Sequence, residues 1–585
     1  MKQFKVAVGV LAVTSCFVTM LLYYWHWLMM SENIHFDAGS SEELDIDNKV
    51  THSTIRPRQY GTPMSHVPLD TIYKDAANDE SLELAEERGP IYLLDTPGCR
   101  IPVSIIPYQI INKKQKHKPG TCGIRAVYLK RVEVDTVQAI IKDKLMKTYL
   151  RKGDRYECCY RFFTKYTHPG KERTKIKYTP CHKLKDLQVF TIESDFVNVK
   201  CSQKDRLKKT SHVIYDDVYP FVKMVSPNEQ SGEEGKRKRF NVLMIGMDSM
   251  SLARFSAVMS RTVKFFEENY WLAYRGFHKI GDNTLPNLMA TFTGLNMSAV
   301  AQKCSGKMDE CRDLFIWNKF RKDGYVTAYG EDHLRLPDTF HDEYEFKKPP
   351  TDHYMRPFFM KEETEFSNQS LVCAGKAPSG QQILDYALDF AVTYRFKCFF
   401  GVFWLNSYSH NANSHPEDGD KTIENFLNRL SYTGILDDTF IIIFSDHGVR
   451  FGELRLLPQS YYDERLPGLF MWVPLLFKSR RTRMFHSAAL NQYKLVTHYD
   501  LYNTLVDIHR VSLNSNSELT ALVGVAEGCP RCHSLFKTIN ANRTCRDAAI
   551  DEKWCACHHI YPLTIEDTEA MKSVDLVVRW KKTFK

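Results

Sequence analysis

The chain has 585 residues, of which 43% are hydrophobic and 25% charged, and its formal net charge is +9. This length exceeds what one hydrophobic core usually organises, so we expect several folded units. The 79 basic and 70 acidic residues are spread along the chain, and the basic clusters contain no interleaved aromatic residues. This charge pattern argues against a nucleic-acid-binding role.

The amino-terminal part of the chain predicts a membrane anchor followed by a stem. Residues 1–5 form a short basic tail, and residues 6–30 contain no Asp, Glu, Lys or Arg and are long enough to cross a bilayer as a helix. Lysines before this segment and acidic residues after it predict a type II membrane protein, with the rest of the chain in a secretory lumen such as the Golgi or at the cell surface. A cleaved signal peptide, which would give a secreted protein, is the alternative. Residues 31–89 are polar and predict a stem without a fold of its own.

Three further regions differ in composition. Residues 90–225 contain short alternating hydrophobic segments separated by Pro, Gly and Lys, which predict a small β-rich domain stapled by disulfides. Residues 226–239 have the composition of a linker. Residues 511–585 carry the last five cysteines and predict a Cys-rich carboxyl-terminal appendage.

The 16 cysteines fit an oxidising compartment. Fifteen lie beyond the anchor in three groups, at 99–201, 304–398 and 529–557, and we expect disulfides within each group. The odd number leaves one thiol free or paired between chains. A zinc knuckle formed by the last group is the alternative, which both the Cys555-x-Cys557 spacing and this compartment disfavour. Three glycosylation sequons fit the same compartment: Asn296, Asn368 and Asn542.

Residues 240–510 predict an α/β domain, because hydrophobic strands alternate with helical patterns. Two strands, at 240–247 and 440–444, run directly into Asp248 and Asp446. Both carboxylates should therefore emerge at the carboxyl edge of a parallel sheet covered on both faces, which is where such sheets bind ligands.

Four side chains predict one metal site with a nucleophile: Asp248, Thr284, Asp446 and His447. Carboxylate oxygen and imidazole nitrogen suit zinc or manganese, and such a cation would lower the pKa of a coordinated Thr284 hydroxyl. Pro286, close behind Thr284, predicts a helix start whose free amides suit a phosphate.

Six motifs follow one another between residues 240 and 536: NVLMIGMDSMS, GDNTLPNLMATFTGL, FWLNSYSH, GILDDTFIIIFSDHG, THYDLYNTLVDI and CHSLF. They resemble the alkaline phosphatase superfamily, which includes sulfatases, nucleotide phosphodiesterases and phosphoethanolamine transferases, and within it the branch known as domain of unknown function 229. The resemblance implies a mixed, mostly parallel sheet sandwiched by helices. It also implies a metal-dependent phosphoesterase or phosphotransferase acting on a phosphodiester of a lipid, glycan or nucleotide.

Carried over residue by residue, the resemblance implies that Asp248, Asp446 and His447 bind one metal ion. Thr284 matches the nucleophile of the phosphodiesterase branch. Asn287, in the same motif, is a candidate donor to the negatively charged phosphoryl oxygens.

The chain departs from the family where members with two metal ions have Asp-x-x-x-His. Here that stretch runs from Asn406 to His410, so the spacing is retained without the carboxylate. Asn406 is a weaker candidate ligand, because an amide oxygen carries no charge, and the site could hold one ion or two. His410 is a candidate contact to the substrate. For the remaining ligand His486 and His498 lie at plausible distances in sequence, although a structural role for His498 beside the core is favoured.

Two alternatives to a phosphodiesterase remain. A sulfatase is disfavoured, because Thr284 replaces the sulfatase cysteine and Glu331 stands where a sulfate-binding lysine is expected. Glu331 and His333 are instead candidates to bind substrate, for example its cationic group. The second alternative is a catalytically silent extracellular binding protein on the same fold, for which Asn406 is the strongest argument.

Overall fold

The computed structural model describes residues 91–103, 120–150, 155–167, 174–204, 211–225, 239–304, 307–334, 339–340, 344–366, 371–411, 414–513 and 526–558. The predicted anchor, the stem and nearly all of the predicted linker lie outside these residues. Within the described part of the chain, no helix has the length and apolar character needed to cross a membrane.

The described residues form two compact units, and the smaller one spans residues 123–224. It contains a five-stranded and a three-stranded antiparallel sheet. The strands are β3 (Val127–Glu133), β4 (Thr136–Ile141), β5 (Glu157–Thr167), β6 (Thr174–Tyr178), β7 (His182–Leu184), β8 (Val189–Thr191), β9 (Phe196–Lys204) and β10 (Ser211–Pro220), with one short helix, α5 (Asp143–Met146). Arg125 and Asp217 form a buried ion pair beside its core, at 2.9 Å.

The larger unit comprises the described residues up to 122 and from 225 onward. Its central sheet has the order β12-β21-β20-β11-β19-β14-β15. The five strands from β20 to β15 pair in parallel, whereas β21 and β12 pair antiparallel at one edge. The strands are β11 (Asn241–Met247), β12 (Leu272–Ala273), β14 (Val326–Glu331), β15 (His353–Tyr354), β19 (Phe399–Leu405), β20 (Thr439–Phe444) and β21 (Leu469–Trp472).

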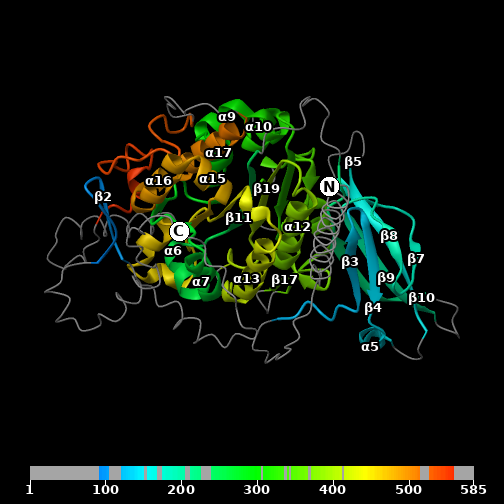
Figure 1. Ribbon diagram of the computed structural model, residues 1–585. Coiled ribbons are helices and arrows are strands. Elements are labelled where there is room, and N and C mark those ends of the chain that lie inside the picture. The colour runs from blue at the N-terminus through cyan, green and yellow to red at the C-terminus, as the bar shows by residue number, and fades with distance from the viewer. Residues whose placement is uncertain are drawn as a thin grey trace, which may run out of the picture. The chain divides into compact units, whose positions relative to one another are not determined.

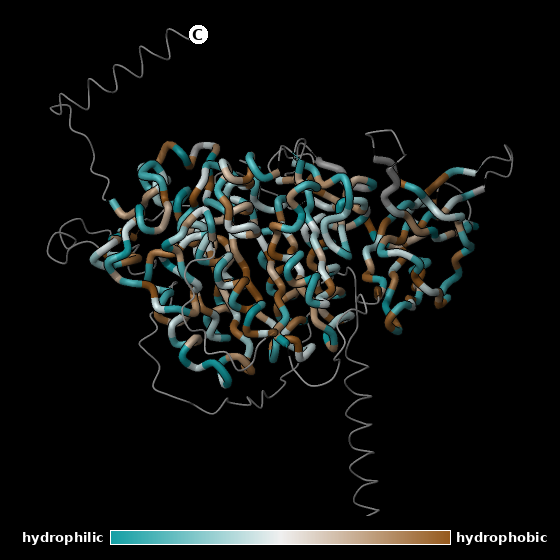
Figure 2. Tube along the Cα trace, turned by 90° about the horizontal axis from the view of Figure 1, so that it is seen from above, coloured by the Kyte–Doolittle hydropathy of each residue, from teal (hydrophilic) through white to brown (hydrophobic). Residues whose placement is uncertain are grey.

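Helices cover both faces of this sheet (Figure 1). Strand β11 is buried along its whole length. On one face of the sheet Val242 and Met244 join the core cluster that contains residues of α8 (Thr284–Thr293) and α17 (His498–Leu513), and the side chains that alternate with them point to the opposite face. Hydrophobic residues concentrate along these central strands (Figure 2). The predicted α/β architecture, a mostly parallel sheet between helices, is confirmed.

The helices of the larger unit are α6 (Leu252–Val258), α7 (Ser260–Glu268), α8 (Thr284–Thr293), α9 (Met297–Cys304), α10 (Ile316–Lys322), α11 (Arg356–Glu362), α12 (Ser379–Thr393), α13 (Glu417–Ser431), α14 (Ser460–Arg465), α15 (Leu475–Arg480), α16 (Thr482–Leu490) and α17 (His498–Leu513). Smaller strands complete the unit: β1 (Tyr92–Thr96), β2 (Cys99–Pro102), β13 (Gly276–His278), β16 (Glu363–Phe366), β17 (Leu371–Ala374), β18 (Ala377–Pro378) and β22 (Leu495–Thr497).

The disulfides correct part of the sequence-based prediction. Among the described residues, five pair within the three expected groups: Cys158–Cys201, Cys159–Cys181, Cys304–Cys311, Cys529–Cys532 and Cys545–Cys555. The prediction is wrong for Cys99–Cys557 and Cys122–Cys373, which join different groups. The reason is that the described residues 91–103 and 120–122 belong to the larger unit, although the chain enters the smaller one immediately afterwards. Cys398 is the one described cysteine outside a disulfide.

Candidate metal centre

Four neighbouring strands place polar residues along the carboxyl edge of the central sheet. Asp446 follows β20 after one serine, Asp248 follows β11 directly, Asn406 follows β19 and Asp332 follows β14. The strands are hydrogen-bonded in this order, and the backbone N–H of Asp248 still donates to Leu405 O at 3.0 Å. The sheet therefore brings side chains that are up to 198 residues apart in sequence to one edge.

Asp248, Asp446 and His447 converge on one point. One ligand atom from each lies within 4.8 Å of the others, and all three residues are buried. His447 Nδ1 lies 2.8 Å from Gly448 O and donates to it, so in the neutral ring the lone pair is on Nε2. This Nε2 lies 3.1 Å from Oδ2 of Asp446, which is buried and accepts no hydrogen bond from the described residues. Two lone pairs that face each other in the protein interior fit a cation between them.

The two carboxylates also differ in their electrostatics. Burial, and next the charge of Asp446, raise the pKa of Asp248. Burial opposes ionisation of Asp446 as well, but the positive charge of a protonated His447 and hydrogen bonds from the backbone N–H groups of Ser249 and His447 hold the pKa of Asp446 below its usual value. A bound divalent cation would allow both carboxylates to be ionised together, so the donor set fits zinc or manganese.

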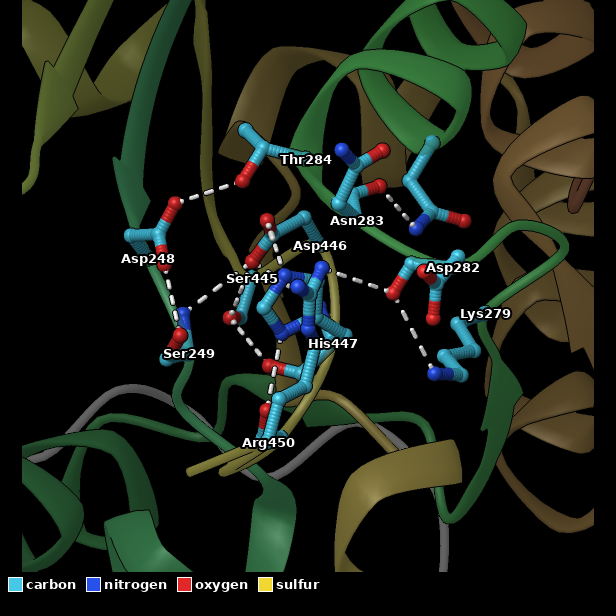
Figure 3. Close-up of polar contacts among 12 residues, drawn as sticks. Asp248, Ser249, Lys279, Asp282, Asn283, Thr284, Ser445, Asp446, His447 and Arg450 are labelled. Carbon is cyan, nitrogen blue, oxygen red and sulfur yellow. Dashed lines mark hydrogen bonds and ion pairs between the residues drawn. The ribbon is translucent and has the colours of Figure 1, made fainter. Parts of the chain in front are cut away.

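Thr284 places a hydroxyl beside this trio (Figure 3). Its Oγ1 donates to Asp248 Oδ2 at 2.8 Å, and the side chain is buried. Thr284 is the first residue of α8, and the N-cap residue Asn283 makes no side-chain capping bond. The first amides of the helix are therefore left for another acceptor, and the helix dipole favours an anion there.

Asn287 holds the loop before Thr284 in place. Its Nδ2 donates to Gly281 O at 3.2 Å and to Asn283 O at 2.9 Å, and its Oδ1 accepts from the backbone N–H groups of Ile280 and Gly281. Both amide hydrogens are thus engaged within the loop. The structure gives Asn287 a positioning role, and its proposed contact to phosphoryl oxygens stays a prediction.

Asn406 is fixed by its neighbours. Its Oδ1 accepts from Trp404 Nε1 at 3.0 Å, and its Nδ2 donates to Glu331 Oε1 at 3.0 Å and to Asp332 O at 2.8 Å. The backbone N–H of His410 donates to Asn406 O, and the charge of His410 lowers the pKa of Asp248. His410 is therefore electrostatically coupled to the trio, whereas only one lone pair of the Asn406 amide oxygen remains for a ligand.

Glu331 and its neighbours brace the loop that follows β19. Glu331 accepts from Tyr329 Oη at 2.9 Å as well as from Asn406, and burial raises the pKa of Glu331 to about 7. Burial also raises the pKa of Asp332, to about 6, while its Oδ1 accepts from the backbone N–H groups of Asn406 and Ser407. His333 is buried with a left-handed backbone, φ 59°. Both Glu331 oxygens thus accept hydrogen bonds from the protein, and the proposed contact of Glu331 to a cationic substrate group stays a prediction.

Two residues that support the metal centre could be found from the sequence, because one is next to a predicted ligand and the other lies in a recognised motif. Ser249, next to a predicted ligand, donates from Oγ to Asp248 Oδ1 at 2.6 Å and from its N–H to Asp446 Oδ1 at 3.1 Å. His498 is fully buried, and its ring nitrogens contact Asp446 O at 3.1 Å and Thr291 Oγ1 at 2.8 Å. These contacts agree with the predicted structural role of His498 beside the core. His486 is exposed on α16.

Two other residues near the site carried no signal in the sequence. Lys279 and Glu464 form a buried ion pair at 2.6 Å behind the loops that carry Thr284 and His447. They are 185 residues apart and belong to no recognisable motif. Only the folded chain brings them together.

Comparisons with known proteins place the chain in a family. No curated protein sequence matches it. Matching solved structures include the lipoteichoic acid synthase LtaP from Listeria monocytogenes (14% identity over 43% of this chain and 69% of that chain, TM-score 0.30) and the periplasmic domain of EcEptC from Escherichia coli in complex with Zn (13%, 49% and 86%, TM-score 0.32). A third is a protein in the alkaline phosphatase superfamily from Vibrio parahaemolyticus (14%, 48% and 67%, TM-score 0.33). Similarity at this level says nothing of the activity of the chain.

Residues 116–585 match the sequence model of a family described as "Protein of unknown function (DUF229)". The chain therefore belongs to the DUF229 family, as its motifs predicted.

Proposed function

We propose that this protein is a metal-dependent phosphoesterase or phosphotransferase that acts on a phosphodiester of a lipid, glycan or nucleotide. One observation carries the proposal: the buried Thr284 hydroxyl lies 2.8 Å from Asp248, within the site where Asp248, Asp446 and His447 converge. A hydroxyl at a helix start, next to a carboxylate acceptor and a cation site, is the arrangement that nucleophilic catalysis of phosphoryl transfer requires.

The proposed reaction has two displacements. Thr284 Oγ1 attacks phosphorus and gives its proton to Asp248 Oδ2, while the bond from phosphorus to the leaving oxygen breaks and that oxygen takes a proton from solvent to leave as the alcohol. Water or an acceptor alcohol then loses a proton to solvent as it attacks the phosphothreonyl ester, and Thr284 Oγ1 leaves and recovers the proton held by Asp248. The free amides at the start of α8 face the phosphoryl oxygens. A divalent cation held by Asp248, Asp446 and His447 would supply Lewis-acid stabilisation of the negative charge.

The donor set favours a single tightly bound ion. Asn406 replaces the carboxylate expected for a second ion, and its amide is already hydrogen-bonded at both ends. An amide oxygen without charge and with one lone pair occupied binds a divalent cation weakly. His410 is then the candidate contact to the substrate.

We further propose a lumenal or extracellular location for this activity, with residues 6–30 as the membrane anchor. The seven disulfides of the described residues support an oxidising compartment. The sequon residues Asn296 and Asn542 are both exposed, which glycosylation requires.

The test uses the purified protein, its metal content and a panel of aryl phosphodiesters and monoesters. We expect turnover of a diester, lost by about a thousandfold or more in Thr284→Ala, with metal content unchanged, because the three strong ligands remain. Thr293→Ala, at the other end of the same helix, is the matched control and should retain turnover. Equal turnover by wild type and Thr284→Ala would remove Thr284 from the chemistry. Metal binding without turnover of any phosphoester would favour the binding-protein alternative.

A further inference from the structure

Glu464 joins the two loops that carry the candidate ligands and the nucleophile. Its backbone O accepts from the N–H of Gly448, whose own carbonyl orients His447. Its Oε1 accepts from Lys279 Nζ at 2.6 Å. Lys279 Nζ in turn lies 3.4 Å from Asp282 O, two residues before Thr284. One residue of α14 is thus linked to the metal-ligand loop on one side and to the nucleophile loop on the other.

This pair is a buried charge cluster that the proposed chemistry does not use. The Lys279 side chain is fully buried, and Oε2 of Glu464 also forms an ion pair with Arg455 at 2.8 Å and lies 3.5 Å from Arg465. Burial lowers the pKa of Lys279 to about 8, although Glu464 and Asp282 oppose this effect. Removing such charges from water costs about as much free energy as their attraction returns, so stability alone does not explain the cluster.

The carboxyl-terminal disulfide-bonded segment, residues 526–558, closes over the same pair. The Trp554 ring in η7 (Glu552–Trp554) lies 3.8 Å from Lys279 Nζ. Arg465 donates to Lys553 O at 2.6 Å, and Tyr461 Oη donates to Cys555 O at 2.7 Å.

One hydrogen bond and two disulfides fix this segment in place. The N–H of Ala556 donates to Nε2 of His278, the residue before Lys279, at 3.2 Å. The Cys99–Cys557 and Cys545–Cys555 disulfides restrain the stretch that contains Trp554. The segment is thus anchored on both sides of its contact with Lys279.

We infer that Trp554, Lys279 and Glu464 are positioning residues of the metal centre. Through Trp554, the Cys-rich carboxyl-terminal segment helps to hold the active-site loops in place. Trp554 holds the ammonium of Lys279 by a cation–π contact, and Lys279 holds the backbone of the loop that presents Thr284. Glu464 fixes this loop relative to His447. The inference rests on the proposed function, in which small displacements of a nucleophile lower the rate steeply.

Trp554→Ala in the full chain tests the inference. We expect kcat to fall by about tenfold or more, with KM and metal content unchanged, because the loop carrying Thr284 loses its support while the ligand trio stays intact. Trp554→Phe keeps an aromatic face for Lys279 and should restore most of kcat. The control is Glu552→Ala, which removes an exposed side chain of the same turn and should leave kcat as in wild type.

A second readout does not need turnover. Hydrogen exchange of the amides of Ile280 and Gly281 should accelerate in Trp554→Ala and stay at the wild-type rate in Trp554→Phe. Unchanged kcat and unchanged exchange in Trp554→Ala would overturn the inference, as would equal losses in the alanine and phenylalanine variants. If the wild-type protein turns over no phosphoester, the proposed function fails, and the exchange rates alone still decide whether Trp554 orders this loop.

Discussion

Replacing His278 by glutamine should make the stability of the larger unit less sensitive to acid. The His278 ring is buried, with Nδ1 2.9 Å from Gly276 O and Nε2 accepting from the N–H of Ala556 at 3.2 Å. Because Ala556 needs an acceptor, the ring is neutral with its hydrogen on Nδ1. Burial, reinforced by the nearby charges of Arg465 and Arg543, lowers the pKa of His278 to about 4.

The sign and size of the effect follow from this shift. The folded pKa lies below the unfolded value of about 6.5, so the unfolded chain takes up a proton below that pH and the folded chain does not until near pH 4. Stability is therefore lost as pH falls through this window. Between pH 7 and pH 5 the linkage relation gives a loss of about 2 kcal/mol from His278.

The assay is urea unfolding of the protein with its disulfides intact, at pH 7 and pH 5, for wild type and His278→Gln. The informative quantity is the difference between wild type and His278→Gln in the change of unfolding free energy from pH 7 to pH 5. Other groups also contribute to each change: Glu331, whose pKa is raised to about 7, gains a proton on folding and so increases stability as the pH falls. A matched control is His182→Gln, which removes an exposed histidine. Identical pH dependences for wild type and His278→Gln would refute the reasoning.

Two further substitutions test the metal number and the smaller unit. Asn406→Asp should raise the metal content from one equivalent to two by adding a charged ligand, as measured by elemental analysis; two tightly bound equivalents in the wild-type protein would contradict the single-ion site. Asp217→Asn should destabilise the smaller unit by about 3–5 kcal/mol in urea unfolding, because it leaves the buried Arg125 without its counter-charge. Asp216→Asn, which breaks a partly exposed pair with Lys200, is the control; equal losses for both substitutions would show that burial of the pair does not matter.

The elements that end in Asp248 and Asp446 could be predicted because their signal is local. A run of hydrophobic residues long enough for one buried strand, followed at once by an acidic residue, marks a parallel strand and its carboxyl end. Two such strands in one sheet bring their ends together, and the structure has both as neighbours. Thr284 could be placed nearby through the helix start that its motif predicts.

The supports of the site could not be predicted in this way. Lys279 and Glu464 form an ion pair although they are 185 residues apart in sequence. The spacing of hydrophobic residues and the turn residues predict helices, strands and turns, but they do not predict which buried cation pairs with which carboxylate. The contacts of Asn287 could not be predicted for a related reason, because its residue type suits both a phosphoryl contact and a bond to the loop backbone, and only the folded loop shows the second. The prediction that cysteines pair within their sequence groups failed for Cys99, because proximity in sequence does not indicate proximity in space when a chain leaves a unit and returns to it.

The Cys99–Cys557 disulfide affects both the oxidative folding of this protein and the products of its proteolysis. The hairpin β1–β2 is synthesised early, yet its covalent partner emerges from the ribosome 458 residues later, so oxidative folding of this unit can be completed only after nearly all of the described residues are available. Once formed, the bond makes a covalent ring of the intervening chain. A protease that cuts a loop once anywhere within that ring leaves the two fragments joined, and they separate on a gel only after reduction.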